Sequence, residues 1–243
     1  MQAWGLTDPG CVRAQNQDAF QIRQFSDKSA LCVVCDGMGG AKSGNIASAL
    51  ALDVFAGQVE RSRKPDMAPQ EIEQMLRTAV YLANETVYDQ SQQFADFSGM
   101  GTTLVAAYLE GSQTVVANVG DSRCYLLNRD GVRCITRDHS LVQLMVQRGE
   151  LTGEQAKSYP GKNFITRAIG TEPKVECDLF RLTVQKGDSL LLCSDGLSNL
   201  LEDQEMLFEV VHGVNKQLCC QRLLDIAKQR GAPDNVTSIL AVI

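Results

Sequence analysis

The stretch LCVVCDGMGGA, residues 31–41, decides how the rest of the sequence is interpreted. It begins as an apolar run rich in β-branched and cysteine residues, which is typical of a buried strand. The run ends at Asp36, and Gly37, Gly39 and Gly40 follow it closely. Because glycine permits sharp turns and a close approach of the backbone, the stretch predicts a carboxylate held at the edge of a core.

Strands dominate the sequence on both sides of this stretch. Short apolar or alternating runs bounded by glycine, aspartate and asparagine predict them, and the Asp130-Gly131 pair is typical of a hairpin turn. A polar turn at residues 26–29 joins the strand at residues 30–35 to the segment before it, as a second hairpin. The other predicted strands are residues 1–7, 102–109, 113–119, 123–127, 132–136, 164–169, 175–182, 188–193 and 236–243.

Helices separate the blocks of strands. Apolar residues at helical spacing predict helices at residues 45–61, 69–93, 140–148, 202–211 and 216–229. Residues 151–163 are polar and include glycine and proline, so we expect a mobile surface segment there. Strand meanders between helices, rather than βαβ repeats, predict antiparallel sheets in an α+β fold. Because no break in composition divides the chain, we expect one domain over residues 1–243.

Composition narrows the class of protein. The chain has 243 residues, of which 44% are hydrophobic, and a formal net charge of −6. This acidic balance argues against a general nucleic-acid binder, whose surface is typically basic. It leaves carboxylates available for binding cations instead.

The cysteines and the first residues indicate a reducing compartment. There are nine cysteines, an odd number, and the opening MQAWGLTDPG lacks the basic and apolar regions of a secretion signal. No apolar run approaches the roughly 20 residues of a membrane span. We therefore expect a cytoplasmic protein with free cysteines and no direct membrane insertion. Cys32 and Cys35 lie three apart on one strand and face opposite sides, which favours core positions over a redox or zinc pair.

Five aspartates share one setting, because each lies at the start or end of a predicted strand beside a glycine or turn residue. They are Asp18, Asp36, Asp121, Asp195 and Asp234. A single aspartate in this setting is most simply a turn former that bonds its own backbone. Five of them, with only two histidines in the chain and no cysteines at metal-binding spacing, favour oxygen ligation of a hard cation such as Mg²⁺ or Mn²⁺.

Eight blocks of sequence carry a resemblance to a known family. They are VRAQNQDAF (12–20), VVCDGMGG (33–40), SGMGTTLVAA (98–107), ANVGDSRCYLL (117–127), TRDHSLV (136–142), ITRAIG (165–170), LLLCSDGLSN (190–199) and GAPDNVT (231–237). In this order, and over nearly the whole chain, the sequence resembles the bacterial metal-dependent protein phosphatases, the type 2C serine/threonine phosphatases. One block alone is weak support, whereas eight in order are specific.

The resemblance implies a fold and a ligand set. The fold is a four-layer αββα sandwich, two central antiparallel sheets flanked by pairs of helices, with a pair of metal ions at one end. Asp36 would bridge the two ions, and the backbone carbonyl of Gly37 would bind one of them. The other implied ligands are Asp18, acting partly through water, Asp121, on a more weakly held third ion, Asp195 and Asp234.

The resemblance also implies the reaction. The two core ions, Mg²⁺ or Mn²⁺, would share a water and lower its pKa enough to give hydroxide near neutral pH. That hydroxide would attack a phosphoserine or phosphothreonine monoester in line, without a phospho-enzyme. Arg13 would act with Asp36 in catalysis by holding the substrate phosphate in its planar fork. The implied partners are phosphorylated proteins and a cognate bacterial Ser/Thr kinase whose signalling is reversed, and we expect a monomer.

Two other functions stay open at the level of the sequence. A non-catalytic adaptor would keep the fold and bind partners, but it predicts gaps in the ligand set, and none is seen. A phosphatase of small phosphorylated metabolites would share the metal site, so the motifs do not separate it from a protein phosphatase.

Several positions beside the implied site have more than one interpretation. His139 is either the general acid for the leaving hydroxyl or a hydrogen-bonding residue that stabilises its loop. Residues 140–163 match a flap beside the site. The chain departs from frequent family residues at Gln17, Ala41, Asn45 and Tyr159. Two of these replace histidines and two replace acidic residues, which bears on metal affinity and on protonation of the leaving group.

Overall fold

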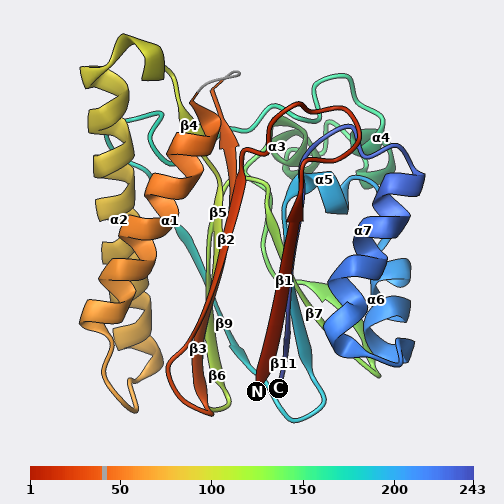
Figure 1. Cartoon of the computed structure of the whole chain (residues 1–243). Coiled ribbons are helices and arrows are strands. Elements are labelled where there is room, and N and C mark those ends of the chain that lie inside the picture. The colour runs from red at the N-terminus through yellow and green to blue at the C-terminus, as the bar shows by residue number, and fades with distance from the viewer. Residues whose placement is uncertain (40–42) are drawn as a thin grey trace.

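Two antiparallel sheets stack face to face, and a pair of long helices covers the outer side of each (Figure 1). This computed structural model describes residues 1–39 and 43–243. It confirms the four-layer αββα sandwich expected from the sequence. Both termini lie at one end of the sandwich, and the flap lies at the other (Figure 1).

One sheet, the β1 sheet, joins the two ends of the chain. In spatial order its strands are β1 (Gln2–Asp8), β11 (Val236–Val242), β10 (Ser189–Cys193), β7 (Arg123–Asn128) and β8 (Gly131–Cys134). The other, the β3 sheet, is ordered β2 (Asp18–Gln24), β3 (Ser29–Met38), β5 (Leu104–Glu110), β6 (Gln113–Val119) and β9 (Asp178–Thr183), with β4 (Gly101–Thr102) pairing with β3. The predicted hairpin around residues 26–29 is the β2–β3 pair.

The long helices bury one face each against the sheets. Helices α1 (Gly44–Ser62) and α2 (Pro69–Gln93) cover the β3 sheet, and α6 (Asp203–His212) and α7 (Cys219–Gln229) cover the β1 sheet (Figure 1). The shorter helical segments are η1 (Ala95–Phe97), α3 (Leu141–Gln147), α4 (Gly153–Lys157), α5 (Asp195–Ser198) and η2 (Lys216–Leu218). Within the described residues, no helix is both long and apolar enough to cross a membrane.

Strand alternation divides the apolar residues among three cores, one between the sheets and one under each helix pair. In β3, Leu31, Val33 and Cys35 face α1 and α2, whereas Cys32 and Val34 face the other sheet. Both faces of β3 are therefore dry, which explains its nearly continuous apolar run. Cys32 and Cys35 do face opposite sides, as predicted. All nine cysteines are free thiols, seven of them buried.

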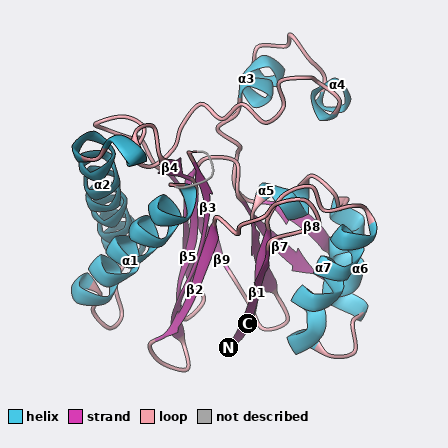
Figure 2. Cartoon of the chain, turned by 45° about the horizontal axis from the view of Figure 1, so that its top comes forward, coloured by secondary structure: helices cyan, strands magenta, loops and turns pink. Residues whose placement is uncertain are grey.

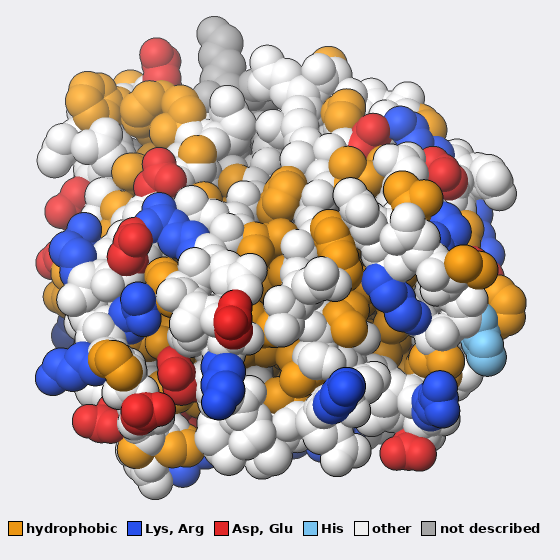
Figure 3. All heavy atoms as spheres, turned by 60° about the horizontal axis from the view of Figure 1, so that its bottom comes forward, with side chains coloured by type: hydrophobic (Ala, Val, Ile, Leu, Met, Phe, Trp, Pro, Cys, Tyr) orange, Lys and Arg blue, Asp and Glu red, His pale blue; other side chains and the backbone are white. Residues whose placement is uncertain are grey.

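The end of the sandwich away from the flap is apolar along its midline. Figure 3 shows a band of apolar side chains between the two halves of the molecule, with charged side chains of both signs on either side. The partly buried residues that pack against the core between the sheets are Met1, Ala3, Phe20, Ile22, Leu126, Ile135, Phe180 and Ile243.

The flap and the segment that follows it, residues 164–169, were predicted least well. Residues 164–169 form no strand, because Ile165 and Ile169 make only isolated bridges, to Ser140 and to Thr102 respectively. Part of the expected loop at residues 151–163 is the helix α4, which the Thr152 hydroxyl caps by accepting from the backbone N–H of Gln155. Figure 2 shows α3 and α4 projecting beyond the ends of both sheets.

Candidate metal centre

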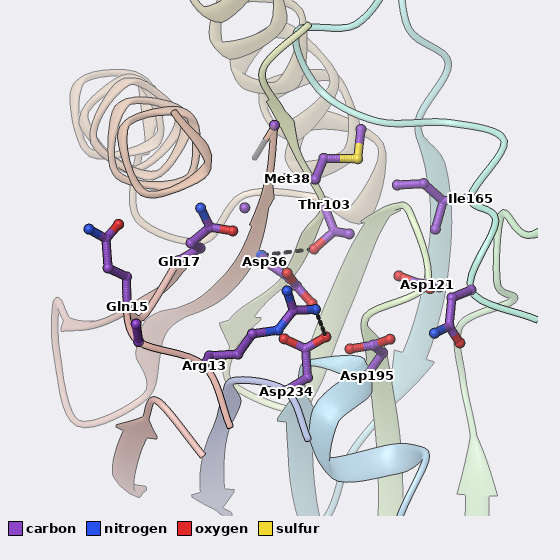
Figure 4. Close-up of a pocket in the computed structure, with 14 residues that line it drawn as sticks. Arg13, Gln15, Gln17, Asp36, Met38, Thr103, Asp121, Ile165, Asp195 and Asp234 are labelled. Carbon is purple, nitrogen blue, oxygen red and sulfur yellow. Dashed lines mark hydrogen bonds and ion pairs between the residues drawn. The ribbon is translucent and has the colours of Figure 1, made fainter. Parts of the chain in front are cut away.

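Four of the five aspartates line one cleft of about 530 Å³ at the flap end of the sandwich (Figure 4). They are Asp36 at the end of β3, Asp121 after β6, Asp195 at the start of α5 and Asp234 before β11. The fifth, Asp18, lies opposite Asp36 in the β2–β3 pairing. The structure thus brings together side chains that are up to about 200 positions apart in the sequence, which the sequence alone did not show.

Asn235 ties the loop that carries Arg13 to the rest of the cleft. Its side-chain N–H groups donate to the carbonyls of Pro9 and Gln15, both at 3.0 Å. Its side-chain oxygen accepts from the backbone N–H of Gln17 at 2.8 Å. Asn235 is only 5% exposed. Its side chain therefore satisfies backbone groups of the loop at a place that water hardly reaches. Asn235 was not predicted as a site residue, and its only signal was its place in the GAPDNVT block.

Thr103 links the turn after Asp36 to the turn that carries Asp121. The Thr103 hydroxyl accepts from the backbone N–H of Asp36 at 3.0 Å and lies 2.7 Å from the Ser122 hydroxyl. The Thr103 N–H also donates to the Asp36 carbonyl at 2.8 Å. We expected Thr103 to be an ordinary residue of a continuous strand over 102–109. Instead the strand is interrupted at Thr103, because its backbone and side chain both bond the Asp36 turn.

Gly37 occupies a place where no side chain fits. Its backbone N–H donates to the Gln17 carbonyl at 3.1 Å, and a Cβ at Gly37 would overlap the carbonyl oxygens of Gly44 and Gln17. Gly39 has φ +134°, which also favours glycine. Gly40 and Ala41, which the sequence analysis singled out, lie outside the described residues.

Asp18 has one oxygen with a partner and one without. Oδ2 accepts from the Ser194 hydroxyl at 2.8 Å, and that hydroxyl accepts from the Thr237 N–H at 3.0 Å. Oδ1 is buried and makes no hydrogen bond. Burial raises the pKa of Asp18 to about 6, although the hydrogen bond from Ser194 opposes the rise. An unpartnered carboxylate oxygen in such a place fits contact with a cation or with water held by one.

The other carboxylates are also costly to ionise in the absence of a cation. Burial, together with the nearby Asp18 and Asp195, raises the pKa of Asp36 well above its usual range. Burial and the charge of Asp195 raise the pKa of Asp121 to about 8, and burial and the charge of Asp234 raise the pKa of Asp195. A bound dication reverses this penalty. The all-oxygen donor set therefore fits Mg²⁺ or Mn²⁺.

Arg13 supplies the positive charge that the cleft holds in this structure. Its guanidinium donates to Asp234 Oδ2 at 2.8 Å (Figure 4), and its side chain is 55% exposed. Among the described residues, no three histidine, cysteine, aspartate or glutamate side chains are gathered closely enough to hold an ion as they stand.

Comparison with known proteins then decides the family. Residues 12–226 match the family described as protein phosphatase 2C. The chain belongs to the protein phosphatase 2C family. The resemblance drawn from the eight blocks is thereby confirmed.

Relatives of this 2C phosphatase cover nearly its whole length. It is 39% identical over 242 residues to the serine/threonine phosphatase Stp of Listeria innocua. The alignment covers 99% of this chain and 95% of the relative. The crystal structure of serine/threonine phosphatase Stp1 from Staphylococcus aureus has a TM-score of 0.93 and 37% identity, covering 100% of this chain and 95% of that chain.

A metal-containing structure is also similar to this 2C phosphatase. The catalytic domain of PstP in complex with two manganese ions has a TM-score of 0.85 and 32% identity, covering 99% of this chain and 97% of that chain. The present chain is a metal-dependent protein serine/threonine phosphatase whose cofactor is Mn²⁺ or Mg²⁺.

In this 2C phosphatase, His139 is not among the residues that line the cleft. Its side chain is 7% exposed, and Nδ1 accepts from the backbone N–H of Gly120 at 3.1 Å. Nε2 lies 3.4 Å from Asp178 Oδ2. These contacts favour the loop-stabilising interpretation of His139 over the general acid.

The flap of the 2C phosphatase contributes directly to the cleft. Asn163, at the end of the flap, lines the cleft beside the aspartates, as does Ile165 just after the flap. A second cavity of about 420 Å³ lies between the flap helices and the α5–α6 region, and Asp121 and Asp195 belong to the walls of both cavities. The flap therefore borders both cavities.

Proposed function

We propose that the cleft removes phosphate from phosphoserine and phosphothreonine side chains of proteins. The proposed metal-binding set is Asp18, Asp36, Gly37, Asp121, Asp195 and Asp234, and Arg13 is the proposed phosphate-binding residue. The observation that supports this assignment is the burial of mutually repelling carboxylates, with raised pKa values, around a cleft open to substrate.

The roles of the residues follow from their places. Asp36, whose backbone is fixed by Thr103, lies opposite Asp18 in the β2–β3 pairing and lines the cleft together with Asp195. Divalent cations bound by this set supply neutralising charge and an acidified water for attack at phosphorus. Arg13 lies at the exposed rim, where its planar fork can donate two charge-assisted hydrogen bonds to phosphate oxygens.

Chelation provides the direct test of this function. Purified protein should hydrolyse a phosphothreonine peptide with Mn²⁺, lose this activity in EDTA, and regain it when excess Mn²⁺ is added. Turnover that persists in EDTA would contradict a metal-dependent site. Faster hydrolysis of sugar phosphates than of phosphopeptides would contradict protein substrates.

Arg13→Ala should lower kcat/KM for a phosphopeptide by roughly 10- to 100-fold, since hydrogen bonds to charged groups contribute about 1.5–3 kcal/mol and each 1.36 kcal/mol is tenfold. Arg13→Lys should fall between this variant and the wild type, because it keeps the charge but loses the fork. Steady-state kinetics at saturating Mn²⁺ measure both.

The control for Arg13 is Arg129→Ala, which removes an exposed arginine from the β7–β8 turn. It should leave kcat/KM unchanged. If Arg13→Ala stays within twofold of the wild type, phosphate binding by Arg13 is wrong.

The cellular role is part of the same proposal. Because β1 pairs with β11 from Gln2 to Asp8, the first and last strands share one sheet, which supports a single catalytic domain over residues 1–243. The buried free thiols support a reducing, cytoplasmic setting. We assign the phosphatase to reversing a bacterial Ser/Thr kinase as a monomer. Sedimentation tests the monomer, and the phosphoproteins that accumulate in a deletion strain test the pathway.

A further inference from the structure

We propose that His139 is a positioning residue that holds the Gly120–Asp121 turn and thereby sets the metal affinity of Asp121. The inference rests on the proposed function only in taking Asp121 as a metal ligand. It assigns to His139 no contact with substrate, since His139 does not line the cleft.

His139 forms hydrogen bonds to Gly120 through both its backbone and its side chain. The His139 N–H donates to the Gly120 carbonyl at 2.9 Å, and the Gly120 N–H donates to His139 Nδ1 at 3.1 Å. Gly120 is buried and has φ +106°, and a Cβ there would lie 2.6 Å from Cγ2 of Thr103. The turn is therefore confined on the Thr103 side by packing and on the other side by the imidazole. Removing the imidazole leaves a buried N–H without its partner.

The opposite edge of the imidazole is held as well. Because Nδ1 accepts a hydrogen bond, a neutral ring carries its proton on Nε2, which lies 3.4 Å from Asp178 Oδ2 and 3.2 Å from Arg167 Nη1. Arg167 donates to the other oxygen of Asp178 at 2.9 Å. Burial and the charge of Arg167 lower the pKa of His139, which favours the neutral ring. A carboxylate that orients an imidazole, which in turn fixes a ligand-bearing segment, is a known way to tune metal affinity.

The backbone around His139 does not depend on its side chain. The Thr166 N–H donates to the His139 carbonyl at 2.7 Å, and the Leu141 N–H donates to the Phe164 carbonyl at 2.8 Å. Substitution of the ring alone therefore leaves the flap base attached. The effect expected from such a variant is a local change at Gly120 and Asp121.

Two substitutions separate the hydrogen bond to Gly120 from the rest of the side chain. In His139→Asn, the amide oxygen stands where Nδ1 stands, one bond beyond Cγ, and accepts from Gly120. In His139→Gln, the amide lies one atom further out, near the place of Nε2, and leaves the Gly120 N–H unpaired. Asp121→Asn identifies the Mn²⁺-binding step that depends on Asp121.

Isothermal titration of the full chain with Mn²⁺ measures these steps without any need for turnover. His139→Gln should weaken the Asp121-dependent step by roughly 10- to 100-fold, the usual cost of losing an outer partner of a metal ligand, and change the other steps less than twofold. His139→Asn should stay within about threefold of the wild type. His212→Gln, which changes the other histidine of the chain, beside Phe208 on α6, should change no step.

Three outcomes would overturn the proposal. A step that is lost in Asp121→Asn but intact in His139→Gln leaves the ligand set standing and rejects the positioning role. Equal weakening of every step by His139→Gln, with a lower melting temperature, indicates a structural role alone. Mn²⁺ binding that is unchanged in both Asp121→Asn and His139→Gln rejects Asp121 as a ligand. It also rejects the positioning role of His139.

Discussion

Asp36→Asn should reduce kcat on a phosphothreonine peptide by about 1000-fold or more, because losing about 4 kcal/mol of metal-mediated charge stabilisation has this effect. Asp36 lies at the centre of the cluster, where its pKa is raised by burial and by four neighbouring carboxylates. An asparagine keeps the size of the side chain but binds a dication poorly. Steady-state kinetics at several Mn²⁺ concentrations measure the loss and show whether more metal restores activity.

The same variant should remain folded. Replacing a buried group that resists ionisation with a neutral amide removes a cost of folding, so the melting temperature in EDTA should equal or exceed that of the wild type. Asp53→Asn, at an exposed position on α1, is the matched control and should keep full activity. A kcat within tenfold of the wild type in Asp36→Asn would be incompatible with its assignment as the shared ligand.

The metal-free protein should lose stability as the pH rises from 5 to 8. In the folded chain the pKa of Asp18 is raised to about 6 and that of Asp121 to about 8, whereas the unfolded carboxyl groups ionise near pH 4. Between these values the unfolded state binds fewer protons, so unfolding is favoured as the pH rises. A shift from about 3.8 to about 6 at Asp18 alone corresponds to on the order of 3 kcal/mol.

Urea unfolding in EDTA at several pH values measures this slope. Below pH 5, acids with a lowered pKa act in the opposite direction, such as Glu205, whose pKa Arg230 and the Glu202 backbone hold at about 2. Within the range from pH 5 to 8, the lowered pKa of His139 also acts in the opposite direction, and we expect the cleft carboxylates, several of which have raised pKa values, to outweigh this one group. Saturating Mn²⁺ should abolish the decline, since a cation favours the ionised carboxylates, and Asp18→Asn should reduce it. Constant or rising stability in EDTA over this range would show that the carboxylates do not repel one another as described.

Much of the fold could be predicted because burial imposes a period on the sequence. Both faces of β3 are dry, so its apolar run is nearly continuous, and α2 begins at Pro69 and ends at Gln93 as its apolar stripe predicted. The prediction of a strand at residues 164–169 was wrong because its apolar residues form bridges to two different partners, Ser140 and Thr102, instead of joining a sheet. Periodicity records that a residue is buried, but not which element buries it.

The metal centre, like the fold, could be predicted from the sequence only in part. The aspartates could be found because carboxylates at strand ends beside glycines form a visible pattern. Their convergence could not, because it depends on pairings such as Asp18 opposite Asp36 and β10 beside β11. Thr103, Ser194 and Asn235 were missed because they act on backbone groups or carboxylates more than 60 positions away. Small polar side chains that serve distant partners leave no local pattern.

The ion pair between Arg13 and Asp234 has a consequence for how metal and substrate bind. In the absence of metal, the guanidinium is a tethered counterion for one of the carboxylates. A phosphate that draws Arg13 away frees Asp234 for a cation, and a cation that takes Asp234 frees Arg13 for phosphate. Since such coupling is reciprocal, metal and phosphoprotein should bind with positive cooperativity, which Mn²⁺ titrations with and without phosphopeptide would display. The metal concentration needed by the idle enzyme then exceeds the concentration needed during turnover.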